Sequence, residues 1–135
     1  MSLHEIYKQF HQQVQFVSIY IREAHPVDGW WFGGGIQESL VKRVFPKVST
    51  DLYDPTTIEE RRAAAGQCED TLKYGIRTYV DLMDDRVNKA YAAYPTRLYL
   101  VDMDGRVAYA GGLGPYGFKP AELKNAVEDC LERIN

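Results

Sequence analysis

The sequence has little of what marks several large classes of protein. Its 135 residues include only two cysteines, Cys68 and Cys130, whose separation fits no zinc or dithiol motif. It has no apolar run of the roughly 20 residues that cross a bilayer, and its first residues lack the basic and then apolar pattern of a signal peptide. The basic residues are scattered and the net charge is −3, which argues against a nucleic-acid partner. We therefore expect either a cytoplasmic protein or one whose export segment precedes this sequence.

Motifs for metals and cofactors are also missing. The aspartates of the C-terminal half do not have the spacing of an EF-hand loop, and we interpret them as solvated loop ends. They are Asp81, Asp84, Asp85, Asp102 and Asp104. The glycines at 33–35 lack the lysine and the following helix of a nucleotide site. We predict no bound metal and no cofactor.

Hydrophobic patterning predicts alternating helices and strands. The segment at 14–21 is an almost unbroken run of β-branched and aromatic residues, which favours a strand buried on both faces. Thr57 and Glu60 form a capping box that begins a helix at Ile58. Both cysteines fall on the apolar sides of predicted helices, which favours reduced, buried thiols over a disulfide. The predicted elements are a helix at 3–13, a strand at 14–21, a helix at 58–75, a strand at 76–82, a helix at 86–93, hairpin strands at 97–102 and 107–110, and a helix from Pro120.

This order of elements predicts the fold. A strand, a helix, a strand, an antiparallel hairpin and a closing helix match the thioredoxin topology without its first strand and active-site loop. We therefore predict a single α/β domain over residues 1–135, thioredoxin-like, with a central mixed sheet and flanking helices. Pro95 stands just before the hairpin, where thioredoxin-like proteins usually carry a cis proline. The long connection at 22–57 is typical of a functional segment.

Three blocks of residues carry a resemblance to a family. They are Ile19 to Trp30 (IYIREAHPVDGW), 81–99 with the stretches DLMDD and YAAYPTRLY, and 105–115 (GRVAYAGGLGP). With these blocks the chain resembles the iodothyronine deiodinases. The resemblance implies a thioredoxin-like and peroxiredoxin-like fold, and an oxidoreductase activity that removes iodine reductively from an iodinated phenol. That family's selenocysteine lies in a loop upstream of the first helix, so we expect a bacterial-type homologue whose sequence here lacks the selenocysteine or cysteine motif.

The resemblance also implies roles for individual positions. Glu23 and His25 match the acidic residue and the histidine of the family's active site, and Arg97 matches the arginine that holds the charged end of the substrate. A further family histidine, just before the helix that begins at Ile58, has no counterpart in the residues 53–57.

The residues themselves support part of this assignment. Glu23 and His25 are two apart at the end of a predicted strand, so their side chains share a face. A carboxylate next to an imidazole favours the charged imidazolium, which can deliver a proton or orient a phenol. The alternative is a loop histidine that makes one backbone hydrogen bond. Trp30, in the aromatic stretch at 30–32, either walls a pocket for a ring-shaped ligand or covers the sheet. Arg97 either clamps a carboxylate or pairs with a nearby aspartate.

Three functions remain open at this point. The chain is an oxidoreductase whose reactive residue lies outside this sequence, a binding module without redox chemistry, or a module completed by a partner chain such as a second copy in a homodimer. Cys68 lies in mid-helix, away from the helix N-terminus that activates thiols, and fits at most a resolving thiol. The expected partners are a small aromatic ligand and, for the enzyme, a thiol reductant.

Overall fold

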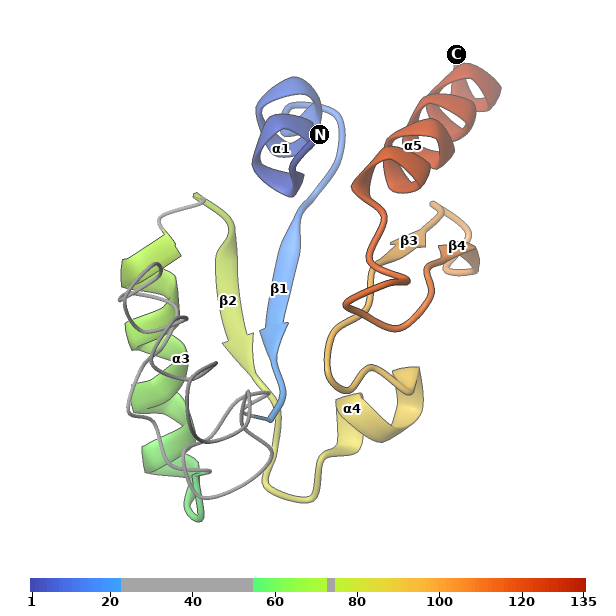
Figure 1. Ribbon diagram of the computed structural model, residues 1–135. Helices are drawn as coiled ribbons and strands as arrows, with labels where there is room; N and C mark the ends of the chain where they lie inside the picture. Colours follow the sequence, from blue (N-terminus) through green and yellow to red (C-terminus); the bar gives the residue numbers. More distant parts are fainter. Residues whose placement is uncertain (23–54, 73–74) are drawn as a thin grey trace. The chain divides into compact units, whose positions relative to one another are not determined.

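The computed structural model describes residues 1–22, 55–72 and 75–135, and within α3 it leaves out the side chains of Cys68 and 70–72 (Figure 1). The chain is a mixed α/β protein with two small sheets and flanking helices. Its residues cluster in two compact units, one formed by 1–16 and 93–135 and the other by 17–92. Each unit is described here by itself.

The first unit joins the two ends of the chain. It contains α1 (Leu3–Phe10), β3 (Tyr99–Val101), β4 (Val107–Ala110) and α5 (Pro120–Ile134). Its hydrophobic core consists of Ile6, Phe10, Leu123 and Val127, and Leu100 of β3 and Tyr109 of β4 pack against it. The core therefore lies between the two helices and one face of the hairpin.

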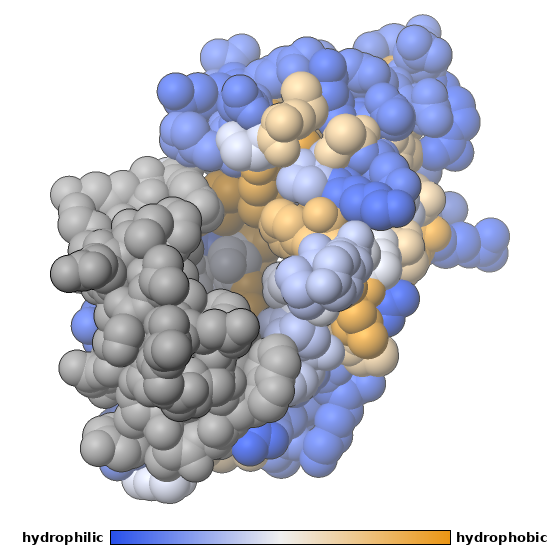
Figure 2. Space-filling model, in the orientation of Figure 1, coloured by the Kyte–Doolittle hydropathy of each residue, from blue (hydrophilic) through white to orange (hydrophobic). Residues whose placement is uncertain are grey.

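Local signals set the ends of α1. The Ser2 hydroxyl accepts a hydrogen bond from the Glu5 amide at 3.2 Å, and the Ser2 amide donates to the Glu5 carboxylate at 2.5 Å. The hydrogen bond from the Ser2 amide lowers the pKa of Glu5. The outer surfaces of α1 and α5 are mostly hydrophilic (Figure 2), so both helices are amphipathic, as their apolar spacing predicts.

The β3–β4 hairpin also forms where the sequence predicts it. Leu100 pairs with Tyr109, and Gly105 takes a φ of 83° in the turn, a conformation that glycine adopts without strain. The Gly105 amide donates to the Asp102 carbonyl at 2.9 Å. The turn lies at the predicted Asp-Gly pair, with Met103 and Asp104 as its central residues and Gly105 in the left-handed position that follows them.

The second unit is built around a parallel pair of strands. β1 (Val17–Tyr20) runs parallel to β2 (Arg77–Val80), with Val17 opposite Arg77. α3 (Ile58–Leu72) lies alongside β2 in the same unit (Figure 1), and α4 (Arg86–Tyr91) follows β2. Ala64 and Ala65 of α3 are buried, as are Ile21 and Ile76 next to the strands.

The prediction that the first strand is buried on both faces is wrong. Val17 is 52% exposed and Ile19 is 41% exposed, on the same face of β1. The strand is also shorter than the apolar run, because Val14 and Phe16 pack against the core of the first unit instead. The described strands form one parallel pair and one antiparallel pair.

The cap of α3 involves both threonines before the helix. The Glu60 amide donates to the Thr57 hydroxyl at 3.2 Å, as expected for a capping box. The Glu60 carboxylate accepts from the Thr56 amide at 2.8 Å and from the Thr56 hydroxyl at 3.1 Å. These two bonds, with a smaller contribution from the Thr57 amide, lower the pKa of Glu60.

Gly66 offers a test of helix propensity in α3. It is exposed, and no atom lies within 4 Å of the position that a Cβ would take. We expect Gly66→Ala to raise the free energy of unfolding by about 0.5–1 kcal/mol, because alanine loses less backbone entropy in a helix. Urea unfolding followed by circular dichroism measures this, and a variant less stable than the wild type would contradict it.

Among the described residues, no helix combines the length and the apolar character that crossing a membrane requires.

Candidate functional site

Most of the predicted site lies outside the described residues. This is the case for Glu23, His25 and Trp30, and Cys68 lies in α3 with its side chain left out. Arg97 is the one predicted site residue whose side chain is described. Arg97 and its contacts are therefore the described part of the predicted site.

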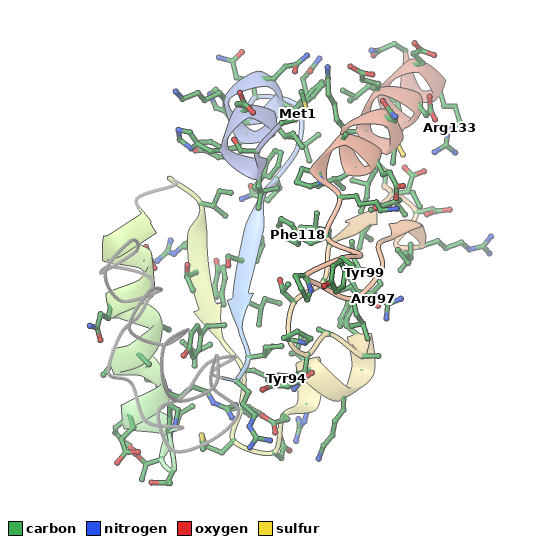
Figure 3. All side chains as sticks on the ribbon, in the orientation of Figure 1. Met1, Tyr94, Arg97, Tyr99, Phe118 and Arg133 are labelled. Atoms are coloured by element: carbon green, nitrogen blue, oxygen red, sulfur yellow. The ribbon has the colours of Figure 1, made fainter. Side chains whose placement is uncertain are left out.

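Gly111 and Tyr99 contact the Arg97 side chain. Its Nε donates to the Gly111 carbonyl oxygen at 2.6 Å, and its guanidinium carbon lies 5.3 Å from the centre of the Tyr99 ring. Arg97 and Tyr99 lie next to each other where the chain enters β3 (Figure 3). A guanidinium over an aromatic face is attracted by the ring quadrupole, so Tyr99 restrains its plane while Gly111 restrains its position. Such a group can receive a carboxylate in a defined orientation.

The surroundings of Arg97 add a neutral phenol. The Tyr109 hydroxyl donates to the Glu122 carboxylate at 3.2 Å. Burial raises the pKa of Tyr109, and the nearby Glu122 raises it further. Tyr109 therefore stays protonated and adds no charge next to Gly111. The peptide bond between Tyr94 and Pro95, on the approach to β3, is cis.

A second polar cluster lies in the other unit and was not predicted. Asp81 is only 2% exposed, so its interpretation as a solvated loop end is wrong. Its Oδ1 accepts from the amides of Leu82 at 2.8 Å and Val87 at 3.0 Å. Its Oδ2 accepts from the amide of Asn88 at 2.9 Å. The carboxylate thus satisfies amide donors of the loop after β2 and of the first turn of α4.

Arg61 of α3 completes this cluster. Its guanidinium, 3% exposed, donates to the carbonyls of Asp81 at 3.3 Å and Leu82 at 2.6 Å. It also pairs with the Asp85 carboxylate at 2.8 Å. The Asp81 amide in turn donates to the Tyr20 carbonyl at the end of β1 at 2.8 Å. Arg61 and Asp81 therefore brace the strand from which the sequence runs on to Glu23 and His25.

Cys130 is buried and free, as predicted. Arg133 donates to its sulfur at 3.0 Å and to the Asp102 carboxylate at 3.3 Å. The hydrogen bond to Cys130, with a contribution from Asp102, raises the pKa of Arg133. In the part of the chain that the structure describes, no three histidine, cysteine or acidic residues are grouped to hold a metal ion.

Comparison with known proteins decides the family. The family model described as iodothyronine deiodinase matches residues 2–131, almost the whole chain. The chain belongs to the iodothyronine deiodinase family. The resemblance drawn from the three sequence blocks is thereby confirmed, and the deiodinase match includes Arg97, Gly111, Arg61 and Asp81.

Individual deiodinases agree with the family match. The chain is 38% identical over 121 residues to thyroxine 5-deiodinase of Aquarana catesbeiana, covering 87% of this chain and 38% of that protein. It is 35% identical over 127 residues to the thyroxine 5-deiodinase of Sparus aurata, covering 94% and 42%. The human thyroxine 5-deiodinase is 30% identical over 131 residues, covering 94% and 37%. The chain thus spans about two fifths of the length of these deiodinases.

Proposed function

We propose that this chain is the ligand-holding part of a thioredoxin-like, deiodinase-type oxidoreductase, and that Arg97 receives the carboxylate of an iodothyronine-type phenol. The observation that carries the proposal is the Arg97 guanidinium, held by the Gly111 carbonyl and the Tyr99 ring within a chain of the deiodinase family. The order of elements supports the thioredoxin-like part of the proposal.

The proposed reaction is a reductive deiodination. The carbon–iodine bond breaks, iodide leaves, and the ring carbon takes a proton. Two thiol groups of a dithiol reductant supply the two electrons by forming a disulfide, so one aryl iodide and two thiols give the arene, a disulfide, iodide and a proton. Glu23 and His25 are proposed to orient the phenol and to deliver the proton, since a histidine next to a carboxylate suits that task. The group that first attacks iodine is assigned to no position in this sequence.

The Arg97→Gln variant tests the proposal. For thyroxine, which carries a carboxylate, we expect the dissociation constant to rise about 10- to 100-fold, since hydrogen bonds to charged groups contribute roughly 1.5–3 kcal/mol. For the analogue of thyroxine that lacks the carboxylate we expect no change. Arg97→Lys should fall between wild type and Arg97→Gln, because lysine keeps the charge and loses the bidentate fork. Isothermal titration calorimetry measures all of these.

A matched control and a second assay complete the experiment. Arg106, an exposed arginine in the hairpin turn, is changed to glutamine as the control and should bind both ligands as the wild type does. If the wild type binds neither ligand, or if Arg97→Gln weakens both equally, the proposed role of Arg97 is wrong. Iodide release with dithiothreitol is the second assay: release above the protein-free rate would contradict a binding module, because such a module performs no redox chemistry.

A further inference from the structure

A loop next to Arg97 contains glycines that have little or no room for a side chain. This glycine loop, residues 111–117 (GGLGPYG), connects β4 to the segment before α5. The Gly111 amide donates to the Leu98 carbonyl at 2.8 Å, and the Gly114 amide donates to the Thr96 carbonyl at 3.0 Å. The loop is therefore tied to the chain on both sides of Arg97, at the residue before it and the residue after it.

The same loop supplies the oxygen that holds the guanidinium. The Gly111 amide donates a hydrogen bond to the Leu98 carbonyl. The Gly111 carbonyl oxygen accepts one from Arg97 Nε at 2.6 Å. A guanidinium is planar, so fixing Nε and stacking the group on Tyr99 sets the direction in which the two terminal nitrogens point. A shift of the Gly111 carbonyl would therefore change the direction in which the two terminal nitrogens of Arg97 point.

Steric contacts keep the loop in place. A methyl group on Gly114 would overlap Thr96 Cγ2, and a methyl group on Gly117 would overlap the Gly112 backbone. At Gly111 a methyl group would lie 3.1 Å from the Leu98 carbonyl oxygen, which is closer than ordinary contact distance. Gly114 and Gly117 therefore have room for a hydrogen atom and not for a methyl group, while a methyl group at Gly111 would require its neighbours to shift slightly. The loop is thus closely packed against Thr96 and Leu98.

We propose that the glycine loop is the positioning element of Arg97 and thereby sets the preference of the site for ligands that carry a carboxylate. The proposal rests on the proposed function of Arg97 and goes beyond it. It assigns specificity to Gly111 and Gly114, which act through Arg97 and need not touch the ligand. Groups that hold a binding side chain within a fraction of an ångström of its productive geometry determine how much of its binding energy is realised.

The contact between Gly114 and Thr96 allows a test in which a second substitution should restore what the first one removes. The measured quantity is the preference ratio, the dissociation constant of the analogue without a carboxylate divided by that of thyroxine. Gly114→Ala should lower this ratio about tenfold, less than the roughly hundredfold loss that a 1 Å misplacement can produce. Thr96→Ser alone should leave the ratio unchanged. The double variant should return it to within about twofold of wild type, because serine lacks the Cγ2 methyl that the new methyl group would overlap.

Each other outcome has a defined meaning. If Gly114→Ala melts as the wild type does and keeps the ratio, or if Thr96→Ser fails to rescue it, the glycine loop does not position Arg97. If Gly114→Ala does not fold, Gly111→Ala decides, because its contacts are tighter than usual without overlapping. A wild-type ratio in that variant overturns the inference. If Arg97→Gln itself leaves the ratio unchanged, the proposed function fails, and that result is distinguishable from a failure of the loop alone.

Discussion

Replacing Asp81 with alanine should lower the free energy of unfolding by about 3–5 kcal/mol, because each buried donor left without its acceptor costs roughly 1–3 kcal/mol. The carboxylate accepts from the amides of Leu82, Val87 and Asn88 at 2.8–3.0 Å. Its loss leaves these amide donors without their acceptor in a site that is almost fully buried. Urea unfolding followed by circular dichroism measures the change.

Asp84 is the matched control for Asp81. It is three residues away and pairs with Arg86 at 3.3 Å, but both side chains are more than half exposed. Exposed ion pairs contribute little, so Asp84→Ala should change the free energy of unfolding by less than about 1 kcal/mol. Equal losses in the two variants would show that the burial of Asp81 has no energetic consequence.

The second large effect is expected in the core of the first unit. Ile6 of α1 is fully buried against Leu123 and Val127 of α5. Ile6→Ala should lower the free energy of unfolding by about 2–5 kcal/mol, because it removes buried methyl and methylene groups and leaves a cavity between the helices. The midpoint of thermal unfolding, followed by circular dichroism, should fall with it.

Ile134, the last residue of α5, is the control for Ile6. Ile134 has the same side chain but is 51% exposed. Ile134→Ala should change stability by no more than about 0.5 kcal/mol, as is usual for surface positions. If Ile6→Ala is as stable as Ile134→Ala, the packing of α1 against α5 does not stabilise the protein.

Elements with strong local signals were predictable from the sequence. The apolar stripe of α5 and the Asp-Gly turn of the hairpin gave the right elements, because periodicity and turn chemistry are properties of neighbouring residues. The ends of the first strand were not predictable. Val14 and Phe16 look like strand residues, yet they pack into the core around α1 and α5. The ends of such a strand depend on which residues pack against it in the folded protein, and a single sequence does not identify those residues.

The same limit applies to the candidate site. Arg97 was found because the resemblance marks it, but its support by Gly111 comes from a contact across 14 positions of sequence. Arg61 and Asp81 looked like ordinary surface charges. The one available signal was local: Asp81 lies near the end of a predicted strand and shortly before a predicted helix, a place where a carboxylate often caps the helix. The predicted roles of Glu23, His25 and Trp30 stay predictions.

The packing of α1 against α5 has a consequence for biosynthesis. The ribosome makes α1 before α5, yet the apolar side of α1 has its partner in α5. At 5–20 residues per second, the roughly 100 residues between the two helices take on the order of 5–20 s to emerge. During that time Ile6 and Phe10 have no α5 to pack against. The nascent chain therefore exposes an apolar helix face that chaperones can bind until α5 has been made.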